Sequence, residues 1–150
     1  MANVFLYFQI FFLINYLENF DFFNLGKEQK IINTPNLPSE NLPLVSIIVA
    51  CWNEEETLED TVSSVFDSEY PNNRIQLLLV DDGSSDDTWK VMQRYKSDEN
   101  IITLTKENGG KFTAINYALG FATGELIATV DADTFLDPKA LPFMVERFLR

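Results

Sequence analysis

The chain has 150 residues, 46 % of them hydrophobic, and a formal net charge of -12. This length suits one domain with a real apolar core, and so acidic a chain lacks the clustered Lys and Arg of a broad nucleic-acid surface, which excludes nucleic acid as a partner. It has one cysteine, Cys51, and no histidine, which excludes an intrachain disulfide, a zinc cluster and every mechanism that uses imidazole.

The amino-terminal segment is strongly apolar. Its first 17 residues carry no side chain that is charged at neutral pH and are rich in Phe, Leu and Ile. As a helix they would extend about 25 Å, just short of the roughly 30 Å hydrocarbon core of a bilayer. We predict a transmembrane or membrane-associated helix over residues 1–26, with Lys27 and Lys30 placing the following part in the cytoplasm. An amphipathic helix, or one packed against a partner, remains an alternative, because Gln9 and Asn15 interrupt the apolar run.

Residues 27–43 contain three prolines and several polar residues, which predicts a linker. After it, apolar runs typical of strands alternate with patterns typical of helices. We expect strands over residues 44–51, 75–80, 101–105 and 125–130, and helices over residues 54–67, 86–96, 111–122 and 138–149. This order indicates an α/β domain, residues 44–150, with a mainly parallel sheet covered by helices on both faces. Such sheets bind ligands at the carboxyl ends of their strands.

Polar residues follow three of the expected strands. They are Trp52, Asn53 and Glu54 after the first strand, Asp81 and Asp82 after the second, and Asp131 and Asp133 after the fourth. If the last strand continues through Asp133, its two carboxylates point to the same side. Two adjacent anions need a cation, and Mg²⁺ uses one or two protein carboxylates together with water and phosphate oxygens. The pair therefore predicts a metal-dependent nucleotide site in an acidic cleft.

The second strand ends in a turn that leads into a helix. Ser84 or Ser85 is expected as the N-cap of that helix. The cap does not account for Asp81 and Asp82, which precede the turn. A carboxylate there can accept hydrogen bonds from a base N–H or a ribose hydroxyl.

Gly109 and Gly110 precede Lys111 at the expected start of the third helix. An open Gly-Gly turn exposes backbone N–H groups, and a lysine beside it adds a positive charge that suits phosphate. A solvated lysine at a helix end is the alternative.

Four strings occur in the chain in this order: VSIIVACWNEEETLEDTVSSVF, LLLVDDGSSDDT, Gly-Lys-x-x-Ala-Ile-Asn and VDADTFLDPKAL. Together they resemble the Rossmann-like nucleotide-binding half of a family 2 glycosyltransferase with the GT-A fold. The likeness is closest to the processive membrane branch, which includes the hyaluronan, chitin, cellulose and poly-N-acetylglucosamine synthases. It covers residues 45–148.

The resemblance implies a UDP-sugar donor and an inverting transfer to a growing polysaccharide or another acceptor. Asp131 and Asp133 would be the DxD motif that holds Mg²⁺ or Mn²⁺ on the diphosphate. The residues that would contact the nucleotide are Ala50, Trp52, Asn53 and Glu54 around the base, Asp82 with Asp81 at the uridine, and Lys111.

The chain also departs from the family pattern. Family members have an acceptor-binding half with a catalytic carboxylate and a Gln-x-x-Arg-Trp string, and this string does not occur up to Arg150. We therefore expect the general base beyond Arg150 or on a companion chain. On this basis the chain alone binds a nucleotide sugar weakly or not at all, and it does not polymerise.

Two readings from other classes remain. The first is a catalytically inactive, membrane-tethered nucleotide-binding module or assembly subunit. The second is a phosphatase of the haloacid-dehalogenase type, because DADTF fits its DxDxT motif, although only 17 residues follow Asp133. A dinucleotide-binding dehydrogenase is disfavoured because no G-x-G-x-x-G follows the first strand.

Overall fold

The computed structural model describes residues 42–149. Its sheet consists of four parallel strands in the order β3-β2-β1-β4. The strands are β1 (Val45–Cys51), β2 (Ile75–Asp81), β3 (Ile101–Thr105) and β4 (Leu126–Asp131), and the helices are α2 (Leu58–Phe66), α3 (Thr88–Met92), α4 (Lys111–Leu119) and α5 (Ala140–Leu149). This order confirms the predicted α/β domain with a parallel sheet.

The predicted membrane helix over residues 1–26 lies outside the described residues, as does nearly all of the predicted linker. In the part of the chain that is described, no helix has the length and apolar character needed to cross a bilayer.

All four helices are shorter than the sequence pattern predicts, since α4 ends at Leu119 and α5 begins at Ala140. Helix α2 begins at Leu58 because residues 54–57 form a turn, in which the N–H groups of Thr57 and Leu58 donate to the Glu54 carbonyl at 3.3 and 3.1 Å. Helix α3 begins at Thr88 with Asp87 as its N-cap residue. The predicted caps Ser84 and Ser85 are therefore wrong for this helix. Short 3₁₀ turns occur at Asn72–Arg74 and Gln93–Tyr95.

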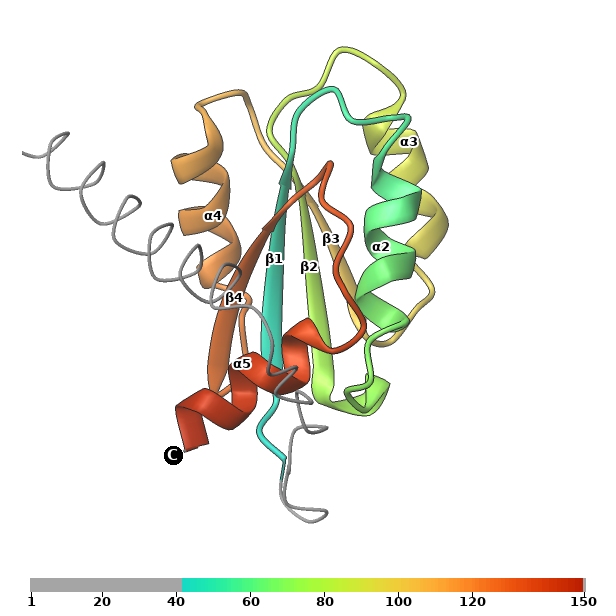
Figure 1. Cartoon of the computed structure of the whole chain (residues 1–150). Coiled ribbons are helices and arrows are strands. Elements are labelled where there is room, and N and C mark those ends of the chain that lie inside the picture. Colours follow the sequence, from blue (N-terminus) through green and yellow to red (C-terminus); the bar gives the residue numbers. More distant parts are fainter. Residues whose placement is uncertain (1–41, 150) are drawn as a thin grey trace, which may run out of the picture. The chain divides into compact units, whose positions relative to one another are not determined.

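The central strands are covered on both faces (Figure 1). Because side chains alternate along a strand, Ile47 and Val49 of β1 pack with α2, α3 and α5, whereas Ile48 packs with Ala114 and Ala118 of α4. These strand residues are at most 1 % exposed. The sheet is thus a rigid apolar layer that fixes the ends of its strands.

Strand β4 differs from the prediction that helices cover both faces of the sheet. Its residues alternate between partly buried and exposed, and Ile127 is 52 % exposed. Coverage on both faces is therefore wrong for β4, which lies at the edge of the sheet while α4 packs on β1 and β2. Asp131 pairs in register with Ala50 of β1, so it lies on the same open face of β4 as Ile127 and is exposed at the end of the strand.

A polar network around the buried Ser46 holds the segment that leads into β4. The Ser46 hydroxyl donates to Gln76 Oε1 at 2.5 Å and accepts the Gly124 N–H at 2.8 Å. Gln76 Oε1 also accepts the Thr123 N–H at 2.9 Å. These bonds join β1, β2 and the start of β4 at the end of the sheet opposite the predicted site.

Candidate functional site

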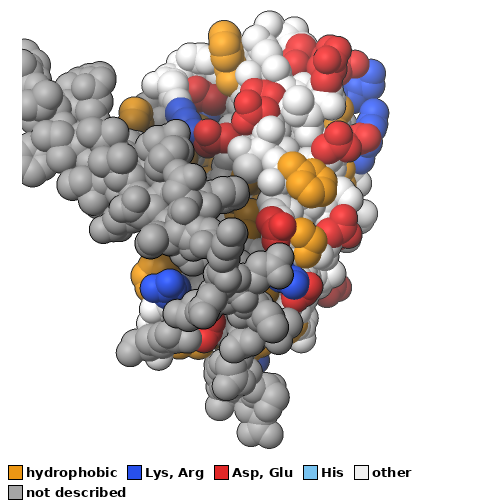
Figure 2. Space-filling model, viewed as in Figure 1, with side chains coloured by type: hydrophobic (Ala, Val, Ile, Leu, Met, Phe, Trp, Pro, Cys, Tyr) orange, Lys and Arg blue, Asp and Glu red, His pale blue; other side chains and the backbone are white. Residues whose placement is uncertain are grey.

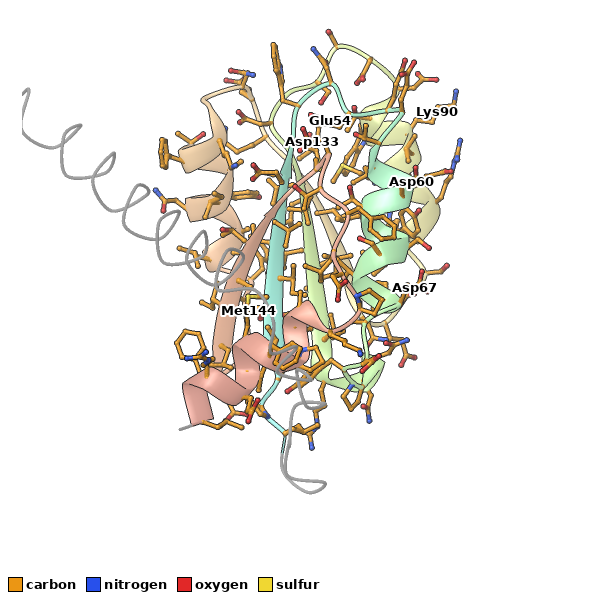
Figure 3. The ribbon with its side chains drawn as sticks, viewed as in Figure 1. Glu54, Asp60, Asp67, Lys90, Asp133 and Met144 are labelled. Carbon is orange, nitrogen blue, oxygen red and sulfur yellow. The ribbon has the colours of Figure 1, made fainter. Side chains whose placement is uncertain are left out.

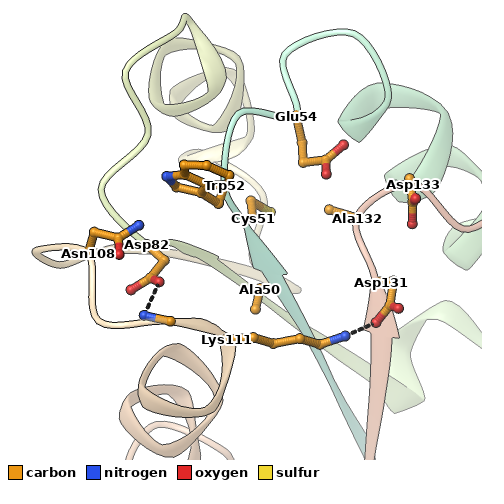
Figure 4. A pocket seen from close by; sticks show the side chains of 11 residues that line it. Ala50, Cys51, Trp52, Glu54, Asp82, Asn108, Lys111, Asp131, Ala132 and Asp133 are labelled. Carbon is orange, nitrogen blue, oxygen red and sulfur yellow. Dashed lines mark hydrogen bonds and ion pairs between the residues drawn. The ribbon is translucent and has the colours of Figure 1, made fainter.

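A cavity of about 450 Å³ opens at the carboxyl ends of β1, β2 and β4 (Figure 4). It is lined by Ala50, Cys51, Trp52, Glu54, Asp82, Asn108, Gly110, Lys111, Asp131, Ala132 and Asp133. Figure 3 shows Glu54 and Asp133 at this end of the sheet, whereas Asp67 lies near the other end. Strand ends that are far apart in the sequence therefore form one site.

Seven of the nine predicted site residues line this cavity. They are Ala50, Trp52, Glu54, Asp82, Lys111, Asp131 and Asp133. Asn53 and Asp81 are not among the lining residues. Asn53, with a positive φ of 57°, accepts the Ser85 N–H on its side-chain oxygen at 2.8 Å. Asp81 is 4 % exposed and accepts the Ser84 N–H and the Thr105 hydroxyl, both at 3.0 Å. Both residues hold loops that surround the cavity.

Asp82 is the most strongly held carboxylate of the cavity. One of its oxygens accepts Lys106 Nζ at 2.6 Å and the Gly109 N–H at 3.1 Å, and the other accepts the Gly110 N–H at 2.7 Å. Burial by itself would raise the pKa of Asp82, but the hydrogen bonds from Lys106, Gly109 and Gly110 outweigh it and hold the pKa below its ordinary value. Asp82 therefore stays ionised.

These contacts alter the prediction for the Gly-Gly turn. The N–H groups of Gly109 and Gly110 were expected to face a phosphate, yet both donate to Asp82. That expectation is wrong for these two groups, because a carboxylate of the chain already occupies the anion position. Within residues 42–149 the N–H groups of Lys111 and Phe112 have no acceptor, so they are the open donors at the start of α4.

The lowered pKa of Asp82 predicts a pH-dependent contribution to stability. A group whose pKa is depressed by folding stabilises the protein above the unfolded value, and the contribution disappears as pH falls through the folded value. The ordinary pKa is 3.8, so the loss occurs below that pH. We expect Asp82→Asn to be less stable than the wild-type chain at pH 7, with a gap that closes as the pH falls below 3.8. Urea unfolding of both chains over this pH range measures it, and a constant gap would contradict the assignment.

Asp131 and Asp133 lie at one rim of the cavity (Figure 4). Strand β4 ends at Asp131, and the Thr134 N–H donates to the Asp131 carbonyl at 3.0 Å. The strand therefore does not continue through Asp133 as the alternation argument assumed, and a turn carries Asp133 to the cavity instead. Lys111 Nζ forms an ion pair with Asp131 across the cavity.

These two carboxylates fit a hard divalent cation. No cluster of three or more Asp, Glu, Cys or His side chains suited to a metal occurs in residues 42–149. Mg²⁺, however, needs only one or two protein carboxylates when water and substrate phosphate supply the rest. The ammonium of Lys111 on Asp131 shows that this carboxylate already pairs with a positive charge. The oxygen donors and their exposure suit a metal that a phosphorylated ligand shares.

The cavity is strongly acidic. Four of its lining residues are carboxylates, namely Glu54, Asp82, Asp131 and Asp133, against the single ammonium of Lys111. Figure 2 shows acidic side chains gathered near this end of the face in view. A diphosphate would be repelled from such a cavity unless a cation entered with it.

The sequence did not point to Cys51, Asn108 or Ala132 as lining residues. Cys51 is buried, which together with Asp81 and Glu54 raises the pKa of its thiol to about 12 and leaves it unreactive. The side-chain amide of Asn108 forms no hydrogen bond within the described residues and lies opposite Trp52 (Figure 4). Its position immediately before the Gly-Gly pair was the available signal.

Comparison with known proteins identifies the family of this chain. The model of the family described as "Glycosyl transferase family 2" matches residues 46–150. The poly-beta-1,6-N-acetyl-D-glucosamine synthase of Staphylococcus epidermidis is 33 % identical over 149 residues, which cover 97 % of this chain and 36 % of the synthase. The synthase of the same name from Staphylococcus aureus is 30 % identical with the same coverage. The chain thus spans about a third of the length of these curated relatives.

Solved structures agree with this result. The mannosyltransferase PcManGT from Pyrobaculum calidifontis, in complex with GDP-Man and Mn2+, has a TM-score of 0.65 at 27 % identity, covering 89 % of this chain and 39 % of its own. S. aureus TarS 1-349 in complex with UDP-GlcNAc has a TM-score of 0.61 at 27 % identity, covering 67 % of this chain and 29 % of its own. The family match contradicts the alternative hypothesis of a haloacid-dehalogenase-type phosphatase. The chain belongs to glycosyl transferase family 2.

Proposed function

We propose that residues 44–150 form the donor-binding part of a GT-A glycosyltransferase that uses a UDP-sugar. The observation that carries the proposal is the single cavity in which Asp131, Asp133 and Lys111 lie together with Trp52 and Asp82. The UDP-GlcNAc complex of the structurally similar TarS supports a UDP-sugar donor, and the relatives named poly-beta-1,6-N-acetyl-D-glucosamine synthase support the same sugar over the mannose of the PcManGT complex.

The base would lie at the Trp52 side of the cavity. The Trp52 side chain is 58 % exposed although it is a large aromatic group, which leaves its ring face open for stacking. The Asn108 amide offers both a donor and an acceptor, as the edge of uracil does. Ala50 and Glu54 complete this wall.

The diphosphate would lie between Lys111 and the two aspartates. Asp131 and Asp133 would hold Mg²⁺ or Mn²⁺, as their oxygen donors suit either ion. When bound, the ion would neutralise the diphosphate and stabilise UDP as a leaving group. Lys111 would exchange Asp131 for a phosphate oxygen, because its ion pair is half-exposed and contributes little stability by itself.

The transfer itself would invert the anomeric centre as an acceptor hydroxyl attacks it. The general base and the binding site for the acceptor or growing polysaccharide would lie outside residues 44–150, for example on a companion chain. Residues 1–26 would attach the domain to the membrane through the linker 27–43 and keep the globular part in the cytoplasm. The apolar amino-terminal sequence, with Lys27 and Lys30 behind it, supports this placement.

Calorimetric titration of the full chain with UDP tests the proposal. We expect weak binding with Mn²⁺ and little without it, because the acidic cavity admits the diphosphate only with a cation. UDP release from a UDP-sugar then separates an active transferase from the inactive nucleotide-binding module, which would bind without turnover. Equal binding with Mn²⁺ and with a chelator, or no binding at millimolar UDP, would contradict the proposed site.

A further inference from the structure

We propose that Asp82 and Lys106 form a positioning pair, which holds residues 106–110 in place and so sets the phosphate-binding end of the cavity. The inference rests on the proposed function and adds how Lys111 and the start of α4 come to face the nucleotide. It also gives Asp82 a role through the loop in place of the predicted contact with uridine.

The donors around Asp82 carry the argument. Its side chain is 4 % exposed and that of Lys106 is 20 % exposed, so the ion pair is largely withdrawn from water. Lys106 Nζ and the Gly109 N–H share one carboxylate oxygen, and the Gly110 N–H takes the other. Both oxygens of the Asp82 carboxylate thus accept hydrogen bonds from residues 106–110, three in all.

The same loop is fixed from its other side. The Lys106 N–H donates to the Asp81 carbonyl at 3.0 Å, and Lys106 Nζ also donates to the Glu107 carbonyl. At Gly83, which has a φ of 73°, a Cβ would lie 2.6 Å from the Asn108 backbone nitrogen. The loop after β2 and residues 106–110 are therefore in direct backbone contact, and Asp82 stands between them.

The position of Gly110 in turn determines the position of the first turn of α4. Gly110 is the N-cap residue, with a φ of 88°, and its carbonyl accepts the Thr113 N–H at 2.9 Å and the Thr113 hydroxyl at 2.8 Å. A shift of Gly110 would therefore move the first turn of α4, with Lys111 and its open N–H group. Displacements of about 1 Å at such a group can cost up to two orders of magnitude in function.

Comparison of uridine with UDP separates positioning from base contact. With Mg²⁺ present, we expect Asp82→Asn and Lys106→Met each to weaken UDP binding roughly tenfold, because both act on the phosphate end. Uridine lacks the phosphates, so its affinity should change less than about twofold. If Asp82 contacts the base directly, Asp82→Asn would weaken uridine and UDP by the same factor. An NMR titration of the full chain measures both ligands.

A measurement without ligand tests whether the Asp82–Lys106 positioning pair holds the loop. Amide hydrogen exchange at Gly109 and Gly110 should become at least about tenfold faster in both variants, since their acceptor is lost or displaced. Lys106→Met keeps the Asp82 side chain and serves if Asp82→Asn folds poorly. Lys106→Arg should restore slow exchange and UDP affinity. The matched control is Lys90→Met, which removes an ammonium from an exposed ion pair with Asp87 on α3.

The outcomes are distinct. Faster exchange at the two glycines together with a selective loss of UDP supports the proposal. If the wild-type chain binds UDP while Lys106→Met and Asp82→Asn bind it equally well, the positioning pair is refuted and the proposed function stands. Equal losses of uridine and UDP also refute it, in favour of base contact. A wild-type chain that binds no UDP contradicts the proposed function.

Discussion

Replacing Asp131 with asparagine should remove the part of UDP binding that depends on Mn²⁺ and leave metal-free binding intact. An amide offers one neutral oxygen where the carboxylate offered a charged pair, so the cation loses much of its attraction. Loss of residues that merely support metal ligands costs roughly 10–100-fold in affinity, and we expect at least that for Asp131. Asp133→Asn should have the same sign, because its side chain lies at the same rim of the cavity.

The ion pair with Lys111 gives Asp131→Asn a distinguishing signature. Once its carboxylate partner is gone, the ammonium is free to approach the diphosphate, so UDP affinity with a chelator present should stay equal or rise slightly. Asp67→Asn is the matched control, since it removes the same charge near the far end of the domain (Figure 3). Calorimetric titrations with Mn²⁺ and with a chelator measure both effects. Undiminished Mn²⁺ dependence in Asp131→Asn would show that the metal lies elsewhere.

The sequence predicted the strands closely because each is a mainly apolar run, although only β1 and β2 are buried along most of their length. The expected strand over residues 44–51 is Val45–Cys51 in the structure, and residues 101–105 are matched in full. The start of α4 at Lys111 was predicted correctly, but those of α2, α3 and α5 were predicted too early. For α2, a partner distant in the sequence decides where the helix begins. The Glu54 N–H donates to the Thr88 hydroxyl, 34 positions away, at 2.7 Å. This bond holds the turn before α2, so the helix begins later than predicted. No local pattern reports such a contact.

The location of the cavity can be predicted from the topology of the sheet, but the hydrogen bonds among the residues around it cannot. Parallel strands bring their carboxyl ends to one edge, so polar residues after β1, β2 and β4 could be grouped before any coordinates existed. The partners of Asp82 lie 24 to 28 positions away on a loop between β3 and α4. Only the path of that loop shows that the Gly-Gly amides serve a carboxylate of the chain.

Replacing Gly124 with alanine should destabilise the domain strongly, because the added methyl group would overlap the backbone of the neighbouring strand. Its Cβ would lie 2.5 Å from the Ser46 nitrogen, 2.7 Å from the Ser46 hydroxyl oxygen and 2.8 Å from the Leu44 carbonyl oxygen. The Ser46 nitrogen and the Leu44 carbonyl oxygen are backbone atoms of β1 and of the residue before it. The overlap can therefore be removed only if the start of β4 moves away from β1. Overpacking of this kind costs about 1–3 kcal/mol or more, and the Gly124 N–H would also lose its bond to Ser46. Urea unfolding of the full chain measures the loss.

Gly120→Ala is the matched control, because it adds the same methyl group where space exists. The nearest atom to its Cβ is the Tyr117 carbonyl oxygen at 3.5 Å, and the backbone φ of -66° suits alanine. The change should leave stability unaltered or raise it by up to about 1 kcal/mol, since alanine restricts the unfolded chain. Equal unfolding midpoints for the two variants would mean that the start of β4 can separate from β1 at little cost. The strand that carries Asp131 would then be held mainly by its later pairs with β1, from Ile48 to Ala50.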